Sequence, residues 1–197
     1  MPLTRRELVE AGLTLGVAVV ASPALGASAA ALPLTPESGL GPYYKRGAPT
    51  ATSLVGPGDP GLPLVVSGRV FDRAGKPLSG AVLEVWHADA RGAYDLAGYR
   101  YRASIVAGPD GSYRFLTVMP GHYPERLAQH IHYRVSAAGR KVLVTQLYFA
   151  TDPAFAGNPD QNWRKDPILA DRRLIRPVTL EDSGGPRAAV VFDTVLG

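Results

Sequence analysis

Two histidines and two tyrosines in the middle of the chain have the types and the spacing of a metal-binding group. His130 and His132 flank one apolar residue, and alternate side chains of an extended strand point to the same face, so both imidazoles would lie side by side. Tyr123 stands shortly before them in a Pro- and Gly-rich turn, from which its phenol can fold back over that face. Tyr94 ends a strand-and-turn segment that a compact sheet can bring alongside. Two nitrogen and two phenol oxygen donors suit a hard, oxidised iron.

Each of these residues also has an ordinary structural interpretation. A His-x-His pair in a strand is more often an exposed or hydrogen-bonded pair than a metal site, and most tyrosines pack with a solvated hydroxyl. The chain has only four histidines, and two of them take same-face positions after a Pro-Gly-His-Tyr-Pro turn. This concentration favours a metal site, and the rest of the sequence has to decide between the two interpretations.

The elements that must position these side chains follow the pattern of short strands. The chain has 22 glycines and 18 prolines, clustered with Asp between short apolar runs. Alternating apolar residues predict three pairs of antiparallel strands and a last strand: 64–72 with 81–86, 99–106 with 112–118, 131–136 with 142–149, and then 188–193. No long amphipathic helix is predicted. The pattern therefore indicates an all-β fold, an antiparallel β-sandwich with long loops.

Two stretches lack a clear period. Residues 32–61 are rich in Pro, Gly, Ser and Thr and are expected to form an arm draped over the domain. Within this arm, Tyr43 and Tyr44 either pack on the core or line one wall of a pocket. Residues 152–185 are expected to be loop-like because prolines interrupt them repeatedly.

Length and charge limit the function classes. A chain of 197 residues allows one domain with a sizeable core. The net charge is +4, but Lys and Arg are scattered among acidic residues without a basic run, so nucleic-acid binding gains no support. No cysteine is present, which excludes disulfides and a lipid-modified cysteine anchor.

Residues 1–30 have the features of an export signal, which leaves 31–197 as the folded domain. Thr4-Arg5-Arg6-Glu7-Leu8-Val9 is a twin-arginine pattern, an apolar run covers 11–21, and Ala27-Ser28-Ala29 fits a cleavage site. An ordinary secretory signal that happens to contain Arg-Arg is the alternative. The run is short for a membrane span, so we expect no stable membrane insertion once the signal is removed. The expected location is periplasmic or extracellular.

Six blocks occur in order along the chain: Gly41-Pro42-Tyr43-Tyr44, residues 68–94 ending in Gly92-Ala93-Tyr94, residues 110–115, Pro120-Gly121-His122-Tyr123-Pro124, His130-Ile131-His132, and residues 145–149. Together they resemble the intradiol ring-cleavage dioxygenases, non-haem ferric enzymes that open catechols between their two hydroxyls. The resemblance extends from about Gly41 to Asp152, and a single block would be far weaker than the ordered set. It implies O2 as co-substrate and a muconate-type diacid as product.

The resemblance also implies a role for each site residue. Tyr94, Tyr123, His130 and His132 match the four Fe(III) ligands, with Tyr94 staying bound and Tyr123 leaving as a base when the catechol arrives. Gln146 resembles a residue near the substrate, although a buried glutamine that satisfies the sheet is equally plausible.

One position departs from the family pattern. The larger members carry an arginine three residues before the first histidine ligand, where the chain has Leu127. Arg126 stands one residue earlier, and the loop from Tyr123 to His130 is shorter than in those members. Either Arg126 reaches the pocket or it is a solvated loop residue, paired with Glu125 or another acid. The segment that forms helical dimers in the catechol-specific branch is also missing, so the chain looks more like the protocatechuate-type core.

The competing function class is a non-catalytic β-sandwich. Residues 67–85 also resemble transthyretin-like and carboxypeptidase-regulatory-like binding modules. Such modules have no need to hold two tyrosines and two histidines together, which distinguishes the two classes. The identity of the catechol and the oligomeric state stay open.

Overall fold

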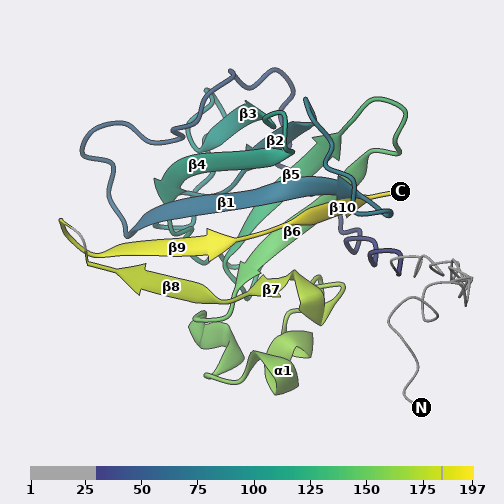
Figure 1. Ribbon diagram of the computed structural model, residues 1–197. Coiled ribbons are helices and arrows are strands. Elements are labelled where there is room, and N and C mark those ends of the chain that lie inside the picture. The colour runs from purple at the N-terminus through teal and green to yellow at the C-terminus, as the bar shows by residue number, and fades with distance from the viewer. Residues whose placement is uncertain (1–29, 183) are drawn as a thin grey trace, which may run out of the picture.

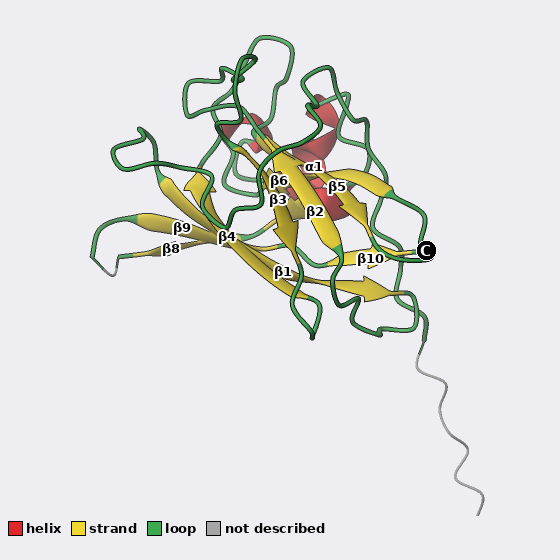
Figure 2. Cartoon of the chain, turned by 90° about the horizontal axis from the view of Figure 1, so that it is seen from above, coloured by secondary structure: helices red, strands yellow, loops and turns green. Residues whose placement is uncertain are grey.

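The computed structural model describes residues 30–182 and 184–197, so the predicted export signal lies outside the described residues except for its last position. The described chain folds into two facing sheets with long loops at one end (Figures 1 and 2). The strands are β1 Pro63–Asp72, β2 Val82–Trp86, β3 Arg102–Val106, β4 Ser112–Val118, β5 His130–Ser136, β6 Leu143–Phe149, β7 Ile175–Arg176, β8 Val178–Glu181, β9 Arg187–Val191 and β10 Thr194–Leu196. The β-sandwich predicted from the alternation is confirmed.

The two sheets are mixed rather than purely antiparallel. In the first, β1 pairs antiparallel with β4 on one side and parallel with β9 and β10 on the other, and β8 extends the sheet beyond β9. The second has the order β3-β2-β5-β6-β7, and its only parallel pair among the described strands is β6 with β7. The parallel neighbours arise because the chain returns to β1 and β6 from distant segments, which a prediction based on adjacent strands does not include.

Two of the three predicted strand pairs are wrong, although the strands themselves are placed well. The predicted strands 64–72 and 81–86 correspond to β1 and β2, which lie in different sheets, and the same holds for β3 and β4. Alternation shows which face of a strand is buried, but it does not show whether the next strand lies beside it or across the core. The third predicted pair, β5 with β6, is confirmed.

The core fills the space between the sheets. On β5, Ile131, Tyr133 and Val135 point inward and are fully buried, and Val66 and Phe115 meet them from the opposite sheet. Burying side chains of this size contributes roughly 1.5–3 kcal/mol each. The even-numbered positions of β5 therefore face away from the core, toward the loops that cover the second sheet.

Irregular segments cover that outer face. The arm predicted at 32–61 is confirmed as a draped loop, and it adds single bridges to β3 at Ser104 and to β4 at Leu116. The segment after β6 is less loop-like than predicted, because it contains the 3-10 helices η1 Pro153–Phe155, η2 Trp163–Lys165 and η3 Arg172–Leu174, the short helix α1 Pro159–Asn162, and strands β7 and β8. Within the described chain, no helix is both long enough and apolar enough to cross a bilayer.

Candidate metal centre

The two histidines occupy the outer face of β5, as the His-x-His spacing predicts. His132 lies between Trp86 of β2 and Gln146 of β6 in the strand register, and the centroids of the His130 and His132 rings are 4.8 Å apart. Both imidazoles are buried, at 2% and 1% exposure. The loops rather than the core cover them, so both nitrogen donors lie beneath the site instead of inside the sandwich.

The two tyrosines arrive from separate turns that pack backbone to backbone. The amide of Gly121 donates to the carbonyl of Asp89 at 2.8 Å. Gly92 has φ +87°, and a Cβ placed on it would lie 1.9 Å from the carbonyl oxygen of His122, so only glycine allows this approach. The contact brings the rings of Tyr94 and Tyr123 to 5.6 Å between centroids.

The structure thus brings all four sequence-predicted ligand candidates together. The ring centroid of Tyr94 lies 6.4 Å from that of His132, and the centroid of Tyr123 lies 5.7 Å from that of His130. The four side chains therefore surround one small volume above β5.

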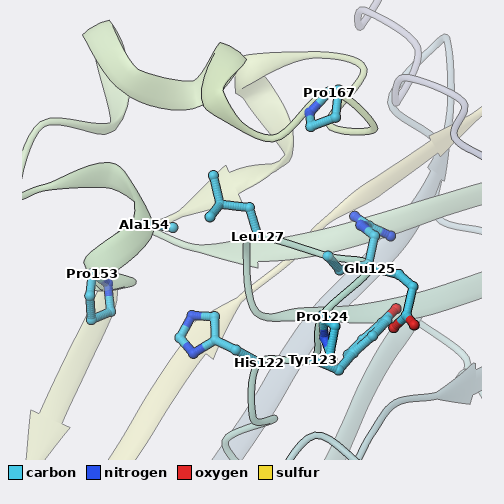
Figure 3. A pocket seen from close by; sticks show the side chains of 9 residues that line it. His122, Tyr123, Pro124, Glu125, Leu127, Pro153, Ala154 and Pro167 are labelled. Atoms are coloured by element: carbon cyan, nitrogen blue, oxygen red, sulfur yellow. The ribbon is translucent and has the colours of Figure 1, made fainter.

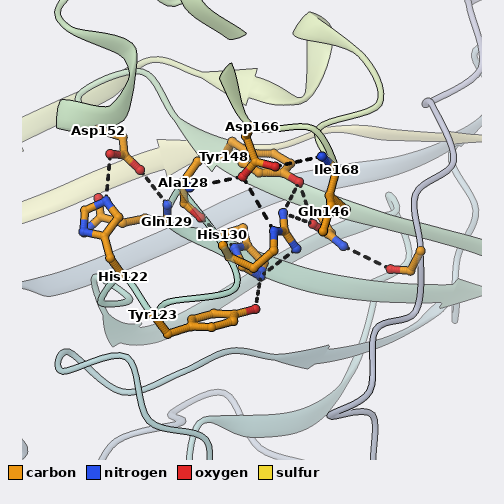
Figure 4. Close-up of polar contacts among 12 residues, drawn as sticks. His122, Tyr123, Ala128, Gln129, His130, Gln146, Tyr148, Asp152, Asp166 and Ile168 are labelled. Atoms are coloured by element: carbon orange, nitrogen blue, oxygen red, sulfur yellow. Dashed lines mark hydrogen bonds and ion pairs between the residues drawn. The ribbon is translucent and has the colours of Figure 1, made fainter. Parts of the chain in front are cut away.

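Hydrogen bonds show which atoms are free to bind a metal. Nδ1 of His130 lies 2.8 Å from the carbonyl oxygen of Ala128, which can only accept, so the proton is on Nδ1 and Nε2 presents its lone pair. The hydroxyl of Tyr123 donates to that Nε2 at 3.2 Å (Figure 4). Both ring nitrogens of His132 and the hydroxyl oxygen of Tyr94 are buried with no hydrogen-bond partner among the described residues.

Unpaired buried polar atoms are costly in a folded protein, and here the hydroxyl of Tyr94 and the ring of His132 both carry such atoms, next to the ring of His130. A bound cation would satisfy the oxygen of Tyr94 and one nitrogen of His132. Among residues 30–182 and 184–197, no group of three or more His, Cys, Asp or Glu is placed to hold a metal ion. The candidate site has only two such residues, because its other two donors are tyrosines. Phenol oxygens with neutral imidazoles fit a ferric ion.

Burial sets the protonation of the donors. It lowers the pKa of His130 to about 3, with help from the nearby charge of Arg126, and it lowers the pKa of His132 well below its usual value, with His130 adding to the effect. Both imidazoles are therefore neutral, which is the form that binds metals. Burial also raises the pKa of Tyr94 and of Tyr123, so both phenols stay protonated until a cation lowers their pKa.

Aromatic and cationic groups fix the side of the site that carries Tyr94. The ring of Tyr43 stacks on that of Tyr94 at 4.2 Å, and Trp86 lies parallel to His132 at 4.9 Å. The guanidinium carbon of Arg102, a buried residue, lies 5.9 Å from the Tyr94 ring centroid. Tyr43 therefore lines the site, whereas Tyr44 packs on Trp86 and donates to a carboxylate oxygen of Glu84.

Arg126 points into the site, so the alternative of a solvated loop residue paired with Glu125 is wrong. Its side chain is 6% exposed, and Nη1 lies 3.3 Å from Nε2 of His130. Nη2 donates to Oε1 of Gln146 at 3.0 Å and to the hydroxyl of Tyr148 at 2.6 Å (Figure 4). Leu127, at the position where the family pattern has arginine, is instead 46% exposed.

Gln146 is a buried glutamine that satisfies the sheet, and its expected place near the substrate stays a prediction. It is buried in β6, where its Nε2 donates to the carbonyl of Gly39 in the arm at 3.0 Å, and it lines the cavity beside His132. The same side chain therefore ties the arm to the sheet and orients Arg126.

Three cavities meet around the loop that carries Tyr123. The first, of about 160 Å³, is lined by the arm together with His132, Gln146 and Ile168. A second, of about 220 Å³, lies beside Tyr94, and a wide groove of about 830 Å³ runs along Leu127, Pro153 and Pro167 (Figure 3). Tyr123 lines all three, so this phenol is the ligand candidate with space to move.

Several residues of the site were not predicted. Two buried carboxylates from the segment after β6, Asp152 and Asp166, hold the loop between Tyr123 and His130, and Tyr148 and Arg102 complete its polar surroundings. Both aspartates precede a proline, which is a turn signal. That signal gives a position in the chain but no partner, so it could not connect them with the site.

Comparisons with known proteins agree on one family. The sequence profile of a family described as Dioxygenase matches residues 40–197. The catechol 1,2-dioxygenase of Acinetobacter baylyi is 32% identical over 192 residues, which cover 82% of this chain and 62% of that protein. The protocatechuate 3,4-dioxygenase beta chain of Burkholderia cepacia is 35% identical over 159 residues, covering 71% of this chain and 66% of that one.

Among solved structures, the dioxygenase domain of a dioxygenase carbohydrate-binding protein fusion from Streptomyces sp. SirexAA-E is 43% identical, with a TM-score of 0.71. The match covers 83% of this chain and 98% of that domain. The chain therefore spans the whole of one solved dioxygenase domain but less than two thirds of the Acinetobacter enzyme.

Proposed function

Because the chain belongs to the intradiol ring-cleavage dioxygenase family, we propose that it is an Fe(III)-dependent enzyme that opens catechols between their two hydroxyls. Both atoms of O2 would enter the product, a muconate-type diacid, so the reaction needs no external reductant. The observation that carries the proposal is the set of free, buried donor atoms on Tyr94 and His132, which face the lone pair of His130.

Four side chains would hold the metal: Tyr94, Tyr123, His130 and His132. A ferric ion bound there would act as a Lewis acid that takes up both catechol oxygens and makes the ring open to attack by O2. The same donors argue against a non-catalytic binding module, which would leave buried polar atoms unpaired without any gain.

Tyr123 is the proposed base. Binding the catechol as an anion requires a proton acceptor, and the oxygen of Tyr123 would accept a proton from a catechol hydroxyl. Its position supports this role, because the ring lines all three cavities and its hydroxyl already donates a hydrogen bond to Nε2 of His130. General bases placed in this way typically contribute 10²–10⁴-fold to the rate.

Arg126 is the proposed stabiliser of negative charge on the bound ring. Its guanidinium lines the smallest of the three cavities, and Gln146 and Tyr148 fix its orientation. A buried cation placed in advance acts more strongly there than it would in water. Replacing Arg126 with Ala should lower kcat/KM on catechol by roughly 10²-fold while the ferric colour survives, because arginine is no ligand.

We further propose that the protein is exported, to the periplasm or the cell exterior, with the twin-arginine pattern at Arg5-Arg6 as support. Fractionation of cells that express the full chain tests this part separately. Mature protein retained in the cytoplasm would contradict it, and replacing both arginines with Lys provides the control.

Iron analysis and oxygen uptake on one preparation test the central proposal. Full-length protein matured with iron available should contain about one iron per chain, absorb visible light through phenolate-to-iron charge transfer, and consume O2 when catechol is added. The product should absorb in the ultraviolet as a conjugated diacid. His132→Ala serves as the matched control without metal. A parent protein without stoichiometric iron and without a visible band would overturn the proposal.

A further inference from the structure

Asp166 lies behind Arg126, in the segment between η2 and η3, and it belongs to none of the six sequence blocks described above. Resting on the proposed function, we propose that Asp166 is a positioning residue. It would hold the guanidinium of Arg126 toward the catechol and allow this arginine to act from a position one residue away from the family pattern.

The contacts of Arg126 support this role because they leave one edge of the guanidinium for Asp166. Nη1 faces His130, and Nη2 is taken by Gln146 and Tyr148. The remaining nitrogen, Nε, lies 3.6 Å from Oδ2 of Asp166, and this is the only carboxylate within ion-pair distance of Arg126 in the described chain (Figure 4). Asp166 is therefore the counter-charge of a buried cation.

Asp166 is itself held rigidly. Its side chain is 0% exposed, Oδ1 accepts the amide of Ile168 at 2.9 Å, and Oδ2 accepts the amide of Ala128 at 3.1 Å. Ala128 stands between Arg126 and His130 in the chain. One carboxylate thus places its charge beside the guanidinium and bonds to the backbone that follows it, and both contacts favour this orientation of the arginine.

The conformation of the loop accounts for the one-residue shift of the arginine relative to the family pattern. The amide of Arg126 donates to the carbonyl of Tyr123 at 3.0 Å, which closes a tight turn and sends Leu127 outward to the groove beside Pro153 (Figure 3). With Leu127 turned away, Arg126 rather than Leu127 supplies the side chain that enters the site beside Tyr123. Asp166 would stabilise this inward orientation of Arg126, because an outward orientation would leave the carboxylate of Asp166 buried and unpaired.

Asp152 provides a matched control. It is also a buried aspartate that precedes a proline, and it also caps this loop, with Oδ2 accepting the amide of Gln129 at 2.5 Å. Its other partners are His122 and Ala154, and no contact with Arg126 is found among the described residues. A loss of loop support alone would therefore appear in Asp152→Asn, whereas a loss of arginine positioning would appear only in Asp166→Asn.

A double-mutant cycle tests the proposal on the full-length, iron-loaded protein. The variants are Asp166→Asn, Arg126→Met, the double variant, and Asp152→Asn alone and with Arg126→Met. We expect Asp166→Asn to lower kcat on catechol by about tenfold with a smaller change in KM and with the visible band retained. In the Arg126→Met background, Asp166→Asn should lower kcat by less than about twofold, because the guanidinium that Asp166 positions is absent.

Thermal unfolding of the metal-free proteins gives a readout that is independent of turnover. Each single variant at 126 or 166 leaves a buried charge unpaired, so the double variant should lose less Tm than the two single losses combined. The Tm losses of Asp152→Asn and Arg126→Met should simply add.

Additive effects of Asp166→Asn and Arg126→Met, in kcat and in Tm, would overturn the inference, and so would loss of iron from Asp166→Asn. Failure of the proposed function looks different, because the parent protein itself would neither bind iron nor consume O2. In that case the positioning role of Asp166 would be excluded as well.

Discussion

The two tyrosines of the candidate centre sit in opposite kinds of surroundings. Tyr94 packs against the ring of Tyr43 and near the guanidinium of Arg102, and its buried hydroxyl has no hydrogen-bond partner among the described residues. Tyr123 stands on a loop that borders three cavities, and its hydroxyl is already bonded to His130. The difference suggests that the first phenol is built to stay in place and the second to move.

The contacts that hold the turn with Tyr94 and the loop with Tyr123 also differ. Arg102 donates to the carbonyls of Tyr43 at 2.6 Å and Asp95 at 3.2 Å, so it joins the arm to the turn that carries Tyr94. The loop with Tyr123 is instead held by two carboxylates, Asp152, which contacts both His122 and Gln129, and Asp166, which accepts the amide of Ala128. The backbone on both sides of Tyr123 is thus held while its ring borders open space, which permits a local rotation of the phenol without unfolding the loop.

The largest expected effect is that of Tyr94→Phe. This change removes a donor for which the rigid side offers no replacement, so the variant should lose most of its iron, its visible band and its activity. Iron analysis and absorbance of protein matured in the same way as the parent provide the measurement. The contrast between the two sides would break down if Tyr123→Phe lost iron to the same extent.

Tyr123→Phe should retain more iron than Tyr94→Phe and yet turn over roughly 10²-fold more slowly, because the proposed base is missing. Single-turnover kinetics on the iron-loaded variant separate this step from substrate binding. Unchanged kcat in a fully loaded variant would remove Tyr123 from proton transfer.

Arg102→Gln probes the fixed side without touching a ligand candidate. The loss of a buried cation near the Tyr94 ring should make a coordinated phenolate a better electron donor and move the visible band to longer wavelength, while kcat/KM falls by less than about tenfold. Absorption spectra at matched iron content decide this point. An unchanged band would mean that Arg102 serves only to join the arm to the turn.

The smallest expected effect belongs to Glu125, an exposed carboxylate that lines all three cavities. Its charge should disfavour catechols that carry a carboxylate, and Glu125→Gln should raise the kcat/KM ratio of 3,4-dihydroxybenzoate to catechol by about 2–5-fold. Added salt should shrink the difference, because exposed charges are screened. A ratio that does not respond to the substitution would exclude Glu125 from substrate selection.

Local patterns predicted the strands and the ligand candidates because both are short-range features. The His130-x-His132 alternation places two imidazoles on one face in any strand, whichever sheet contains it. The pairing of β1 with β9, or of Arg126 with Asp166, depends instead on where distant segments meet. Nothing at Asp166 itself distinguishes a buried counter-charge from the Asp-Pro turns found elsewhere in the chain.

The pairing of β1 with strands from the end of the chain bears on the order of folding. The sheet under the candidate centre draws β3, β2, β5 and β6 from residues 82–149, so its strands can pair before the rest of the chain has been synthesised. Strand β1 must wait for β9 and β10, which follow it by more than a hundred residues. Contacts of such long separation form slowly. The apolar face behind the histidines therefore stays incompletely covered until β9 and β10 have been synthesised, and a chain truncated before Arg187 should aggregate rather than fold.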